Sequence, residues 1–251
     1  IMKKIWLIGA SEGIGRAVAR ELGKNVDNFL ILSARNGERL LDLSSELEAN
    51  SIICPVDVGD SQSVEGCWKE IINKATTIDT IIYCAGYYAP MTAENIDVAQ
   101  IEKMINVNLV GAVRVLSQAV PEFIGKKSGH IVLISSIAGY RGLPNDTGYG
   151  SSKSGLIHLA ENLNCDLSEY GIKVQLISPG FVRTRLTDLN NFRMPSLMST
   201  EQAAKHIAKA IESKNFEVRF PFFFASCLKL LSLLPYSVYF WLMRKMRARL
   251  K

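Results

Sequence analysis

The chain has 251 residues, of which 48% are hydrophobic and 21% are charged. This composition supports a large buried core and excludes an intrinsically disordered protein, and the length suits one large α/β domain. The net charge is +5, yet residues 1–243 are neutral overall because the last eight residues carry five cations and no acid. A neutral body argues against a nucleic acid as partner.

The cysteines and histidines indicate neither a disulfide frame nor a metal site. The five cysteines are scattered and include no Cys-x-x-Cys pair, and the three histidines (His130, His158 and His206) stand far apart in the sequence. We therefore expect reduced thiols and no bound metal. The chain begins with a strand-like segment at Ile5–Ile8 and shows no signal peptide pattern. Both observations predict a cytoplasmic protein.

The first strand leads into a glycine-rich turn. The apolar run Ile5–Ile8 stops at Gly9, Gly13 and Gly15 follow, and apolar residues then recur at helical spacing. Glycines in such a turn let the backbone approach a pyrophosphate at the N-terminus of the helix. A glycine turn can also begin an ordinary helix, so this motif favours nucleotide binding without establishing it.

Strand and helix patterns then alternate to residue 220. The apolar runs predict about seven parallel strands covered by helices on both faces, which is a single Rossmann-type doubly wound sheet of the α/β class. Expected strands after the first are 29–32, 52–56, 80–84, 131–135, 174–177 and 216–220, and the later expected helices are 99–119, 149–170 and 200–213. We divide the chain into a domain at 1–220 and a C-terminal extension at 221–251.

A tyrosine and a lysine four residues apart are the main candidates for catalysis. If Tyr149 opens a helix, Tyr149 and Lys153 lie on one face of it. A phenol has a reference pKa of ~10, and a nearby ammonium favours the phenolate. Such a tyrosine exchanges a proton with a carbonyl or alcohol oxygen, and the Ser136 hydroxyl is placed to bond that oxygen. The same spacing also occurs in ordinary amphipathic helices.

These motifs together resemble those of the short-chain dehydrogenases/reductases over residues 3–220. The chain contains, in the family's order, Gly9-x3-Gly13-x-Gly15, Asp57-Val58, Cys84-Ala85-Gly86, Asn108, Ser136, Tyr149-x3-Lys153 and Pro179-Gly180 followed by Thr184. Three positions, in two motifs, depart from the family pattern. Tyr83 and Cys84 precede Ala-Gly where members often have two asparagines, and Ile8 replaces a common threonine.

The resemblance implies hydride transfer between a nicotinamide cofactor and a carbonyl or alcohol carbon. It implies that Tyr149 is the acid/base, that Lys153 lowers its pKa and bonds the nicotinamide ribose, that Ser136 orients the substrate oxygen, and that Asn108 holds a relay water. Without the family, Asn108 reads as a polar side chain bonded to helix backbone. Cofactor contacts are implied for Gly9, Ser11, Gly13, Ile14, Gly15, Arg35, Asp57, Val58, Ala85, Gly86, Tyr149, Lys153, Pro179, Gly180, Val182 and Thr184.

The second strand indicates the cofactor type. NAD-binding members carry an acid about 20 residues beyond the glycine turn, whereas this chain reads Ser33-Ala34-Arg35-Asn36 there. A guanidinium pairs well with a 2′-phosphate, so NADP(H) is favoured over NAD(H). Arg35 in a solvated loop is the alternative.

The substrate is less specified. Mostly apolar side chains are expected to wall the pocket, and residues 183–199 are expected to form a mobile lid whose arginines Arg183, Arg185 and Arg193 either meet an acidic carrier or are solvated. A lipophilic ketone or an acyl thioester fits these features. The expected walls are Tyr87, Tyr88, Ile137, Tyr140, Leu143, Phe181, Val182 and Leu186.

The extension is too apolar for a solvated tail. Lys229 and Pro235 interrupt it, which predicts two short helices rather than one membrane-spanning helix. Its aromatic residues and the basic run 244–251 are typical of an interfacial anchor, so peripheral membrane contact through 222–251 is one reading. Packing on a neighbouring subunit of a homodimer or homotetramer, or over the substrate pocket, is the other.

A non-catalytic NADP(H) sensor and a membrane scaffold remain as alternative functions of the protein, although neither function needs all four of Asn108, Ser136, Tyr149 and Lys153.

Overall fold

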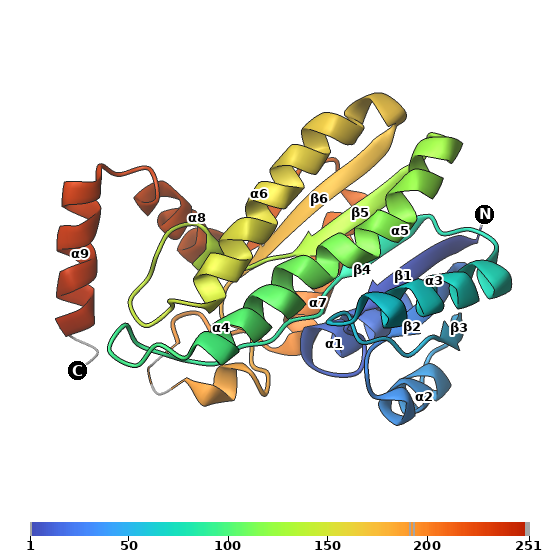
Figure 1. Cartoon of the computed structure of the whole chain (residues 1–251), viewed down its shortest axis with the longest axis horizontal. Coiled ribbons are helices and arrows are strands. Elements are labelled where there is room, and N and C mark those ends of the chain that lie inside the picture. Colours follow the sequence, from blue (N-terminus) through green and yellow to red (C-terminus); the bar gives the residue numbers. More distant parts are fainter. Residues whose placement is uncertain (1, 191, 193, 249–251) are drawn as a thin grey trace.

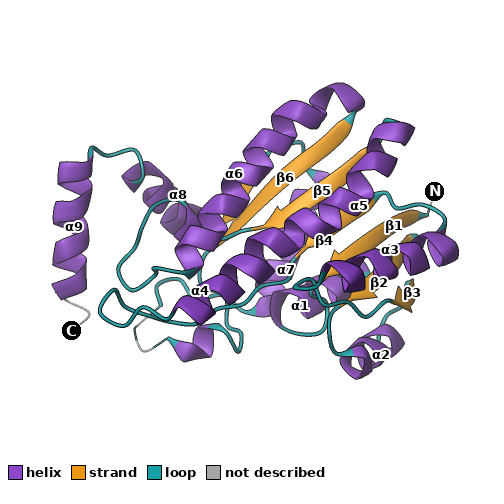
Figure 2. Cartoon of the chain, in the orientation of Figure 1, coloured by secondary structure: helices purple, strands orange, loops and turns teal. Residues whose placement is uncertain are grey.

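The fold is a seven-stranded parallel sheet with helices on both faces, as the sequence predicts (Figures 1 and 2). The computed structural model describes residues 2–190, 192 and 194–248. The strand order is β3-β2-β1-β4-β5-β6-β7. The strands are β1 Lys3–Ile8, β2 Asn28–Ser33, β3 Asn50–Ile53, β4 Thr80–Tyr83, β5 Gly129–Ile134, β6 Ile172–Pro179 and β7 Glu217–Phe220.

The strand order reverses at β1, which lies between β2 and β4. In open parallel sheets, ligands bind outside the carboxyl ends of the strands at such a switch point. The glycine turn that follows β1 and the segment that follows β4 therefore meet at this switch point. The backbone topology alone thus predicts that a ligand binds there.

Two layers of apolar side chains cover the sheet. One face packs against α1 Gly13–Leu22, α2 Gly37–Ser45 and α7 Thr200–Glu212, and the other against α3 Ser61–Ala75, α5 Gly111–Lys126 and α6 Tyr149–Leu167. Strand β4 and the Ile5–Ile8 part of β1 are wholly buried, and for that reason their sequences are mostly apolar.

Strand β3 is displaced from the expected 52–56 to Asn50–Ile53. Pro55 has no N–H to donate and interrupts the ladder. The chain nevertheless continues beside β2, because the Cys54 and Val56 amides donate to Leu32 and Ala34 at 2.9 and 3.0 Å. The apolar pattern thus located the segment but not its regular part.

The long helix expected at 99–119 is in fact continuous from α4 Val98–Ile105 through a π-turn at Asn106–Val110 to the end of α5 at Lys126. It passes through Pro121, and Phe123 beyond the proline is fully buried. By length and composition Val98–Lys126 is apolar enough to cross a membrane. Its inner face covers the sheet, so part of this apolar character belongs to the core.

The C-terminal extension forms two short helices, α8 Phe222–Leu231 and α9 Tyr236–Ala248, separated at Pro235 as expected. Helix α8 lies near the end of α6 that carries Tyr149, and α9 stands at one end of the molecule (Figure 1). Residues 249–251 of the basic run lie outside the described residues.

Candidate active site

A cavity of about 980 Å³ lies outside the carboxyl ends of the strands. It extends from the glycine turn after β1, past the segments after β2 and β4, to the first turn of α6 and the segment after β6. Every residue that the sequence nominates for cofactor binding lines it, as do Ser136 and Cys84. The sequence therefore locates the cavity correctly, while the role of each lining residue stays a prediction.

The glycine turn is shaped for close approach. Gly9 has φ +89°, and a Cβ there would lie 2.6 Å from the Ala85 amide nitrogen, so only glycine fits between β1 and the segment after β4. Gly13 also has a positive φ, of +55°, at the N-terminus of α1. Backbone N–H groups at such a terminus suit a pyrophosphate. The turn and the cavity thus fit a dinucleotide cofactor.

Tyr149 is the first residue of α6, and Lys153 follows one turn later on the same wall of the cavity. Lys153 is 4% exposed, and its Nζ donates to the Ile134 carbonyl at 2.9 Å and lies 5.7 Å from the centre of the Tyr149 ring. Ser136 follows β5, and its Oγ accepts from the Ala138 amide at 3.1 Å. The three side chains that the sequence groups together do share one site.

The electrostatics differ from the expectation. Burial raises the pKa of the Tyr149 phenol, the Asp146 carboxylate adds to that rise, and the Ser136 hydroxyl opposes it. Burial also lowers the pKa of Lys153 to about 8. The expected lowering of the Tyr149 pKa by Lys153 is therefore not present in the protein alone, because desolvation of the phenolate dominates. A phenol that keeps its proton suits the role of proton donor in a reduction.

Asn108 lies in the π-turn and is fully buried behind the cavity wall. Its Nδ2 donates to the Tyr87 carbonyl at 3.0 Å and to Ser152 Oγ at 2.8 Å, and its Oδ1 accepts from the Tyr87 amide at 2.7 Å. Both amide hydrogens are used, so only Oδ1 has capacity for a water. These bonds hold the segment after β4 against α6.

Asp146 was not nominated from the sequence, although it precedes Tyr149 by one helical turn. Its Oδ1 accepts from the Gly150 amide at 3.0 Å, while its Oδ2 is buried and has no hydrogen-bond partner among the described residues. Burial raises the pKa of this carboxyl to about 7. Tyr88, whose ring meets that of Tyr149 edge-on at 5.2 Å, is the other titratable group affected by Asp146.

Arg39 is a second residue that sequence reasoning missed. Arg35 and Arg39 both line the end of the cavity beyond β2, one helical turn apart. Glu12, in the glycine turn, pairs with Arg39 at 2.9 Å and with Arg185 of the expected lid at 2.7 Å. Arg35 has no ion-pair partner among the described residues. Two guanidinium groups thus lie at this end, and Arg193 of the lid falls outside the described residues.

The other end of the cavity is mainly apolar. Seven of the expected wall residues line it, but Tyr140 does not, because its hydroxyl donates to Glu217 at 2.7 Å and its ring lies under Lys229. The C-terminal helices supply part of this wall through Phe224, Leu228 and Met246, which is one of the readings that the sequence left open. Phe192 of the expected lid also lines this end.

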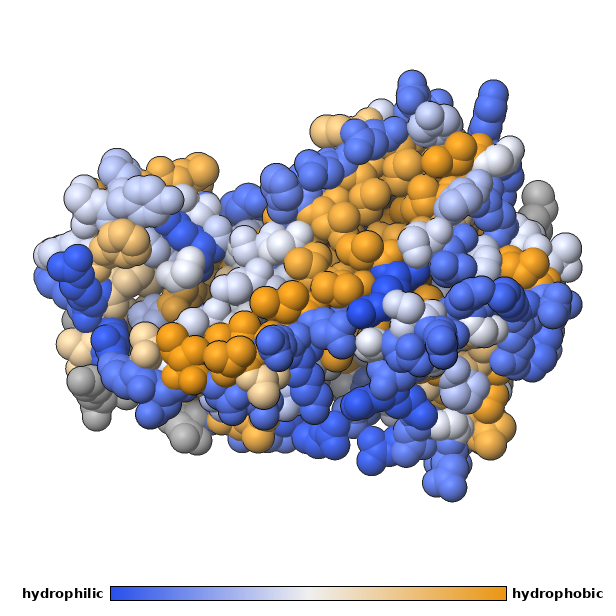
Figure 3. Space-filling view, viewed as in Figure 1, coloured by the Kyte–Doolittle hydropathy of each residue, from blue (hydrophilic) through white to orange (hydrophobic). Residues whose placement is uncertain are grey.

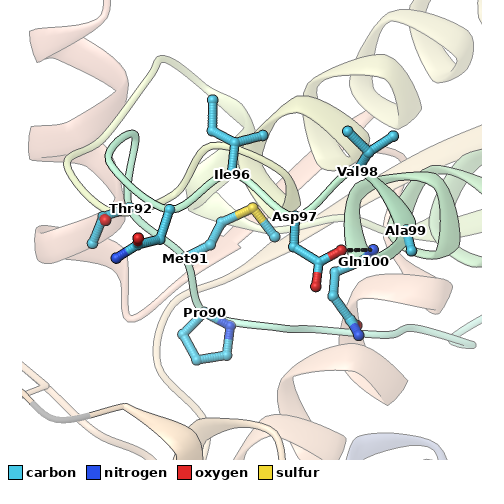
Figure 4. A pocket seen from close by; sticks show the side chains of 9 residues that line it. Pro90, Met91, Thr92, Ile96, Asp97, Val98, Ala99 and Gln100 are labelled. Carbon is cyan, nitrogen blue, oxygen red and sulfur yellow. Dashed lines mark hydrogen bonds between the residues drawn. The ribbon is translucent and has the colours of Figure 1, made fainter.

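A second, more open hollow lies before α4 and is lined by Pro90–Thr92 and Asn95–Gln100 (Figure 4). Its carboxylate, Asp97, accepts from the Gln100 amide at 3.1 Å and so caps the helix. Ile96 and Val98 beside it are more than half exposed. None of the catalytic candidates contributes to this hollow, so we assign it no chemistry.

Comparisons with known proteins agree with this geometry. The family described as short chain dehydrogenase matches residues 3–193. An uncharacterized oxidoreductase of Myxococcus xanthus is 32% identical over 242 residues, or 95% of each chain, and a 3-oxoacyl-[acyl-carrier-protein] reductase of Rickettsia prowazekii is 33% identical over 185 residues, covering 74% of this chain and 75% of the relative.

The solved structure of ElxO with NADP bound is 27% identical, with a TM-score of 0.78 over 87% of this chain and 97% of that one. The family match covers most of the chain, and Ser136, Tyr149 and Lys153 line one cavity. The chain therefore belongs to the short-chain dehydrogenase family of NAD(P)-dependent oxidoreductases.

Proposed function

We propose that the protein reduces the ketone group of a lipophilic or acyl-thioester substrate with NADPH. The observation that carries the proposal is the continuity of one cavity, which joins two arginines and a glycine turn at one end, Tyr149 in the middle and apolar walls at the other. The nicotinamide would supply the hydride. Tyr149 would give its proton to the carbonyl oxygen, and the Ser136 hydroxyl would hold that oxygen and stabilise its developing charge.

The preference for NADP(H) rests on charge at the end of β2. Arg35 and Arg39 face a position where an NAD-binding member would carry an acid, and a 2′-phosphate pairs well with guanidinium groups. ElxO, which is similar in sequence and fold, holds NADP. Lys153, whose Nζ is buried beside the β5 carboxyl end, would bond the nicotinamide ribose, and Asn108 would support a relay water through Oδ1.

The substrate class rests on the apolar walls. Phe192 and Phe224 each pack against Phe181, with ring centres 5.8 and 6.0 Å apart, and the apolar wall that they form suits a hydrocarbon chain better than a polar sugar. The Rickettsia relative is named as a reductase of 3-oxoacyl groups on acyl carrier protein. Arg183 and Arg185 of the lid suit the acidic surface of such a carrier.

The test is NADPH oxidation with a panel of ketones and 3-oxoacyl thioesters of increasing chain length. We predict that Tyr149→Phe binds NADPH nearly as well as the wild type while turnover falls by about two to four decades, the scale of lost acid–base catalysis. Fluorescence titration measures binding, and loss of NADPH absorbance measures turnover. Equal turnover by the variant would contradict the role of Tyr149. A non-catalytic NADP(H) sensor would bind NADPH but would not oxidise it in the presence of any ketone or thioester of the panel.

We also propose that the protein is a cytoplasmic homodimer or homotetramer. Apolar side chains form a band over α5 and α6 (Figure 3), and Val113 within α5 is 45% exposed. A band of this kind marks an interaction surface, and light scattering measures the mass of the assembly. We further propose that the chain consists of a domain at 1–220 and a C-terminal extension at 221–251, and that the extension makes a peripheral contact with a membrane.

A further inference from the structure

The C-terminal helices have an inner face that belongs to the substrate cavity. Phe224 and Leu228 of α8 and Met246 of α9 line it, and Phe224 packs against Phe181, which follows β6. Ala225 on the same helix is fully buried. The extension therefore closes the apolar end of the cavity and does not project freely.

Arg141 ties this roof to the segment between Ser136 and Tyr149. Its guanidinium donates to the Ser232 and Leu234 carbonyls, at the end of α8 and in the turn before α9, at 2.9 and 2.6 Å. The Tyr239 ring lies 4.1 Å from the same guanidinium, and its hydroxyl donates to the Gly142 carbonyl at 2.9 Å. The position of α8 and α9 is thus coupled to the loop that carries the catalytic candidates.

The outer face of the same helices is apolar and aromatic. Phe223 is 84% exposed, Leu233 76% and Trp241 54%. Phe223 belongs to α8, Trp241 to α9 and Leu233 to the turn between them, and none of the three is buried in a core. Both helices are too short to span a bilayer, since a span takes ~20 residues. Large exposed aromatic side chains at this density mark a contact surface.

The charge of the extension selects the partner. Residues 222–251 contain six cations and no acid. Lys229 pairs with Glu217 and Arg247 with Glu94, whereas Arg244 and Lys245 have no carboxylate partner in the part of the chain that the structure describes. A second copy of this face would bring cations against cations. A layer of anionic headgroups over hydrocarbon matches both the charge and the aromatic rings.

We infer that the outer face of α8 and α9 docks on a bilayer of anionic phospholipid, and that the cavity under these helices takes its lipophilic ketone from that bilayer. The second half of this inference rests on the proposed function, and the first half does not. Docking places the roof of the cavity at the lipid surface, so a substrate dissolved in the bilayer reaches Tyr149 without crossing water.

The docking test is flotation with phosphatidylglycerol vesicles. The variant Phe223→Ser/Trp241→Ser removes two exposed rings that do not line the cavity, and Val26→Ser/Leu41→Ser is the matched control, because both of its residues are more than half exposed far from the extension. We expect the wild type and the control to float with the vesicles at low salt. Flotation of both should decrease at high salt and with phosphatidylcholine vesicles. The ring variant should bind the phosphatidylglycerol vesicles with an affinity lower by about tenfold or more. A wild type that stays in the soluble fraction at low salt would overturn the inference. So would a ring variant that lowers the oligomer mass in light scattering, because the face would then bind a second copy.

The delivery test compares a short water-soluble ketone with a long-chain ketone dissolved in the same vesicles. We expect the ring variant to keep wild-type turnover of the soluble ketone and to lose about tenfold in the rate with the vesicle-borne ketone. An equal rate of the two proteins with the vesicle-borne ketone would overturn delivery. Inactivity of both proteins toward every ketone would contradict the proposed function instead, and flotation would still decide the docking.

Discussion

Asp146 shows how much a single buried side chain contributes that spacing alone does not reveal. Its Oδ1 is bonded to the start of α6, its Oδ2 has no partner among the described residues, and burial raises the carboxyl pKa to about 7. The residue lies one turn before Tyr149 and raises the pKa of that phenol. Its ionisation therefore bears on both stability and catalysis.

We predict that Asp146→Asn stabilises the protein at about pH 8 by about 1–3 kcal/mol, because the neutral amide removes a negative charge that burial disfavours. Because the folded pKa is raised from 3.8 to about 7, the folded protein retains a proton that the unfolded chain loses between these values, so the wild type loses stability as the pH rises toward 7. The amide keeps the Gly150 bond and does not titrate. Urea unfolding of both proteins at about pH 5 and about pH 8 measures the difference, which should grow with pH. A difference that does not change with pH would contradict the raised pKa.

The arginines at the end of β2 give a second prediction at this scale. Arg35→Ala should raise the dissociation constant of NADPH by about ten- to a hundredfold and leave that of NADH unchanged, because only NADPH carries the 2′-phosphate. Arg20→Ala, which removes an exposed ion pair with Glu46 outside the cavity, is the control. Equal losses for NADPH and NADH would show that Arg35 contacts a part common to both.

At the scale of elements, apolar runs and glycines were enough to predict the number of strands and their approximate places, whereas the strand order and its switch point came from the structure. The π-turn was not predictable. Its five residues change the backbone hydrogen bonds from the α-helical to the π-helical pattern, but this change leaves the apolar spacing of the long helix almost unaltered. Tyr140 was placed in the pocket wrongly because the short helical turn Ile137–Gly139 rotates it toward Glu217. Arg39 and Asp146 were missed because a charged residue three or four positions from a motif is also common on solvent-exposed helices and loops, so the sequence alone gives no sign of a role in the site.

The C-terminal helices give the prediction at this scale. Arg141→Met removes the donors to Ser232 and Leu234, so we expect amide hydrogen exchange in 222–248 to become faster by about tenfold, while exchange in β5 stays unchanged. Arg16→Met, which breaks an exposed pair with Glu46, should leave exchange in 222–248 as it is. Unchanged exchange in Arg141→Met would mean that packing at Ala225 and Tyr239 alone holds the helices.

At the scale of the whole molecule, the fold assembles residues from distant parts of the sequence into one path. The turn after β1, the arginines after β2, the start of α6 and the C-terminal helices meet along the carboxyl edge of the sheet. The sequence alone predicted the turn, Arg35 and the start of α6, since their motifs precede or follow strands, but it did not predict Arg39. Packing of the extension over the pocket was one of several readings of the sequence, and only the structure selects it, because the contact depends on tertiary packing that no local pattern encodes.

The central claim is that this cavity carries hydride from NADPH to a carbonyl carbon while Tyr149 supplies the proton. The most direct test uses NADPH with deuterium in place of both hydrogens on the hydride-donating carbon, together with the best ketone of the panel, and reads the product by mass spectrometry and NMR. Transfer of the deuterium to the carbinol carbon, on one face only, and its near absence with Tyr149→Phe is the result that we predict. Consumption of the ketone with no deuterium in the product would contradict the claim.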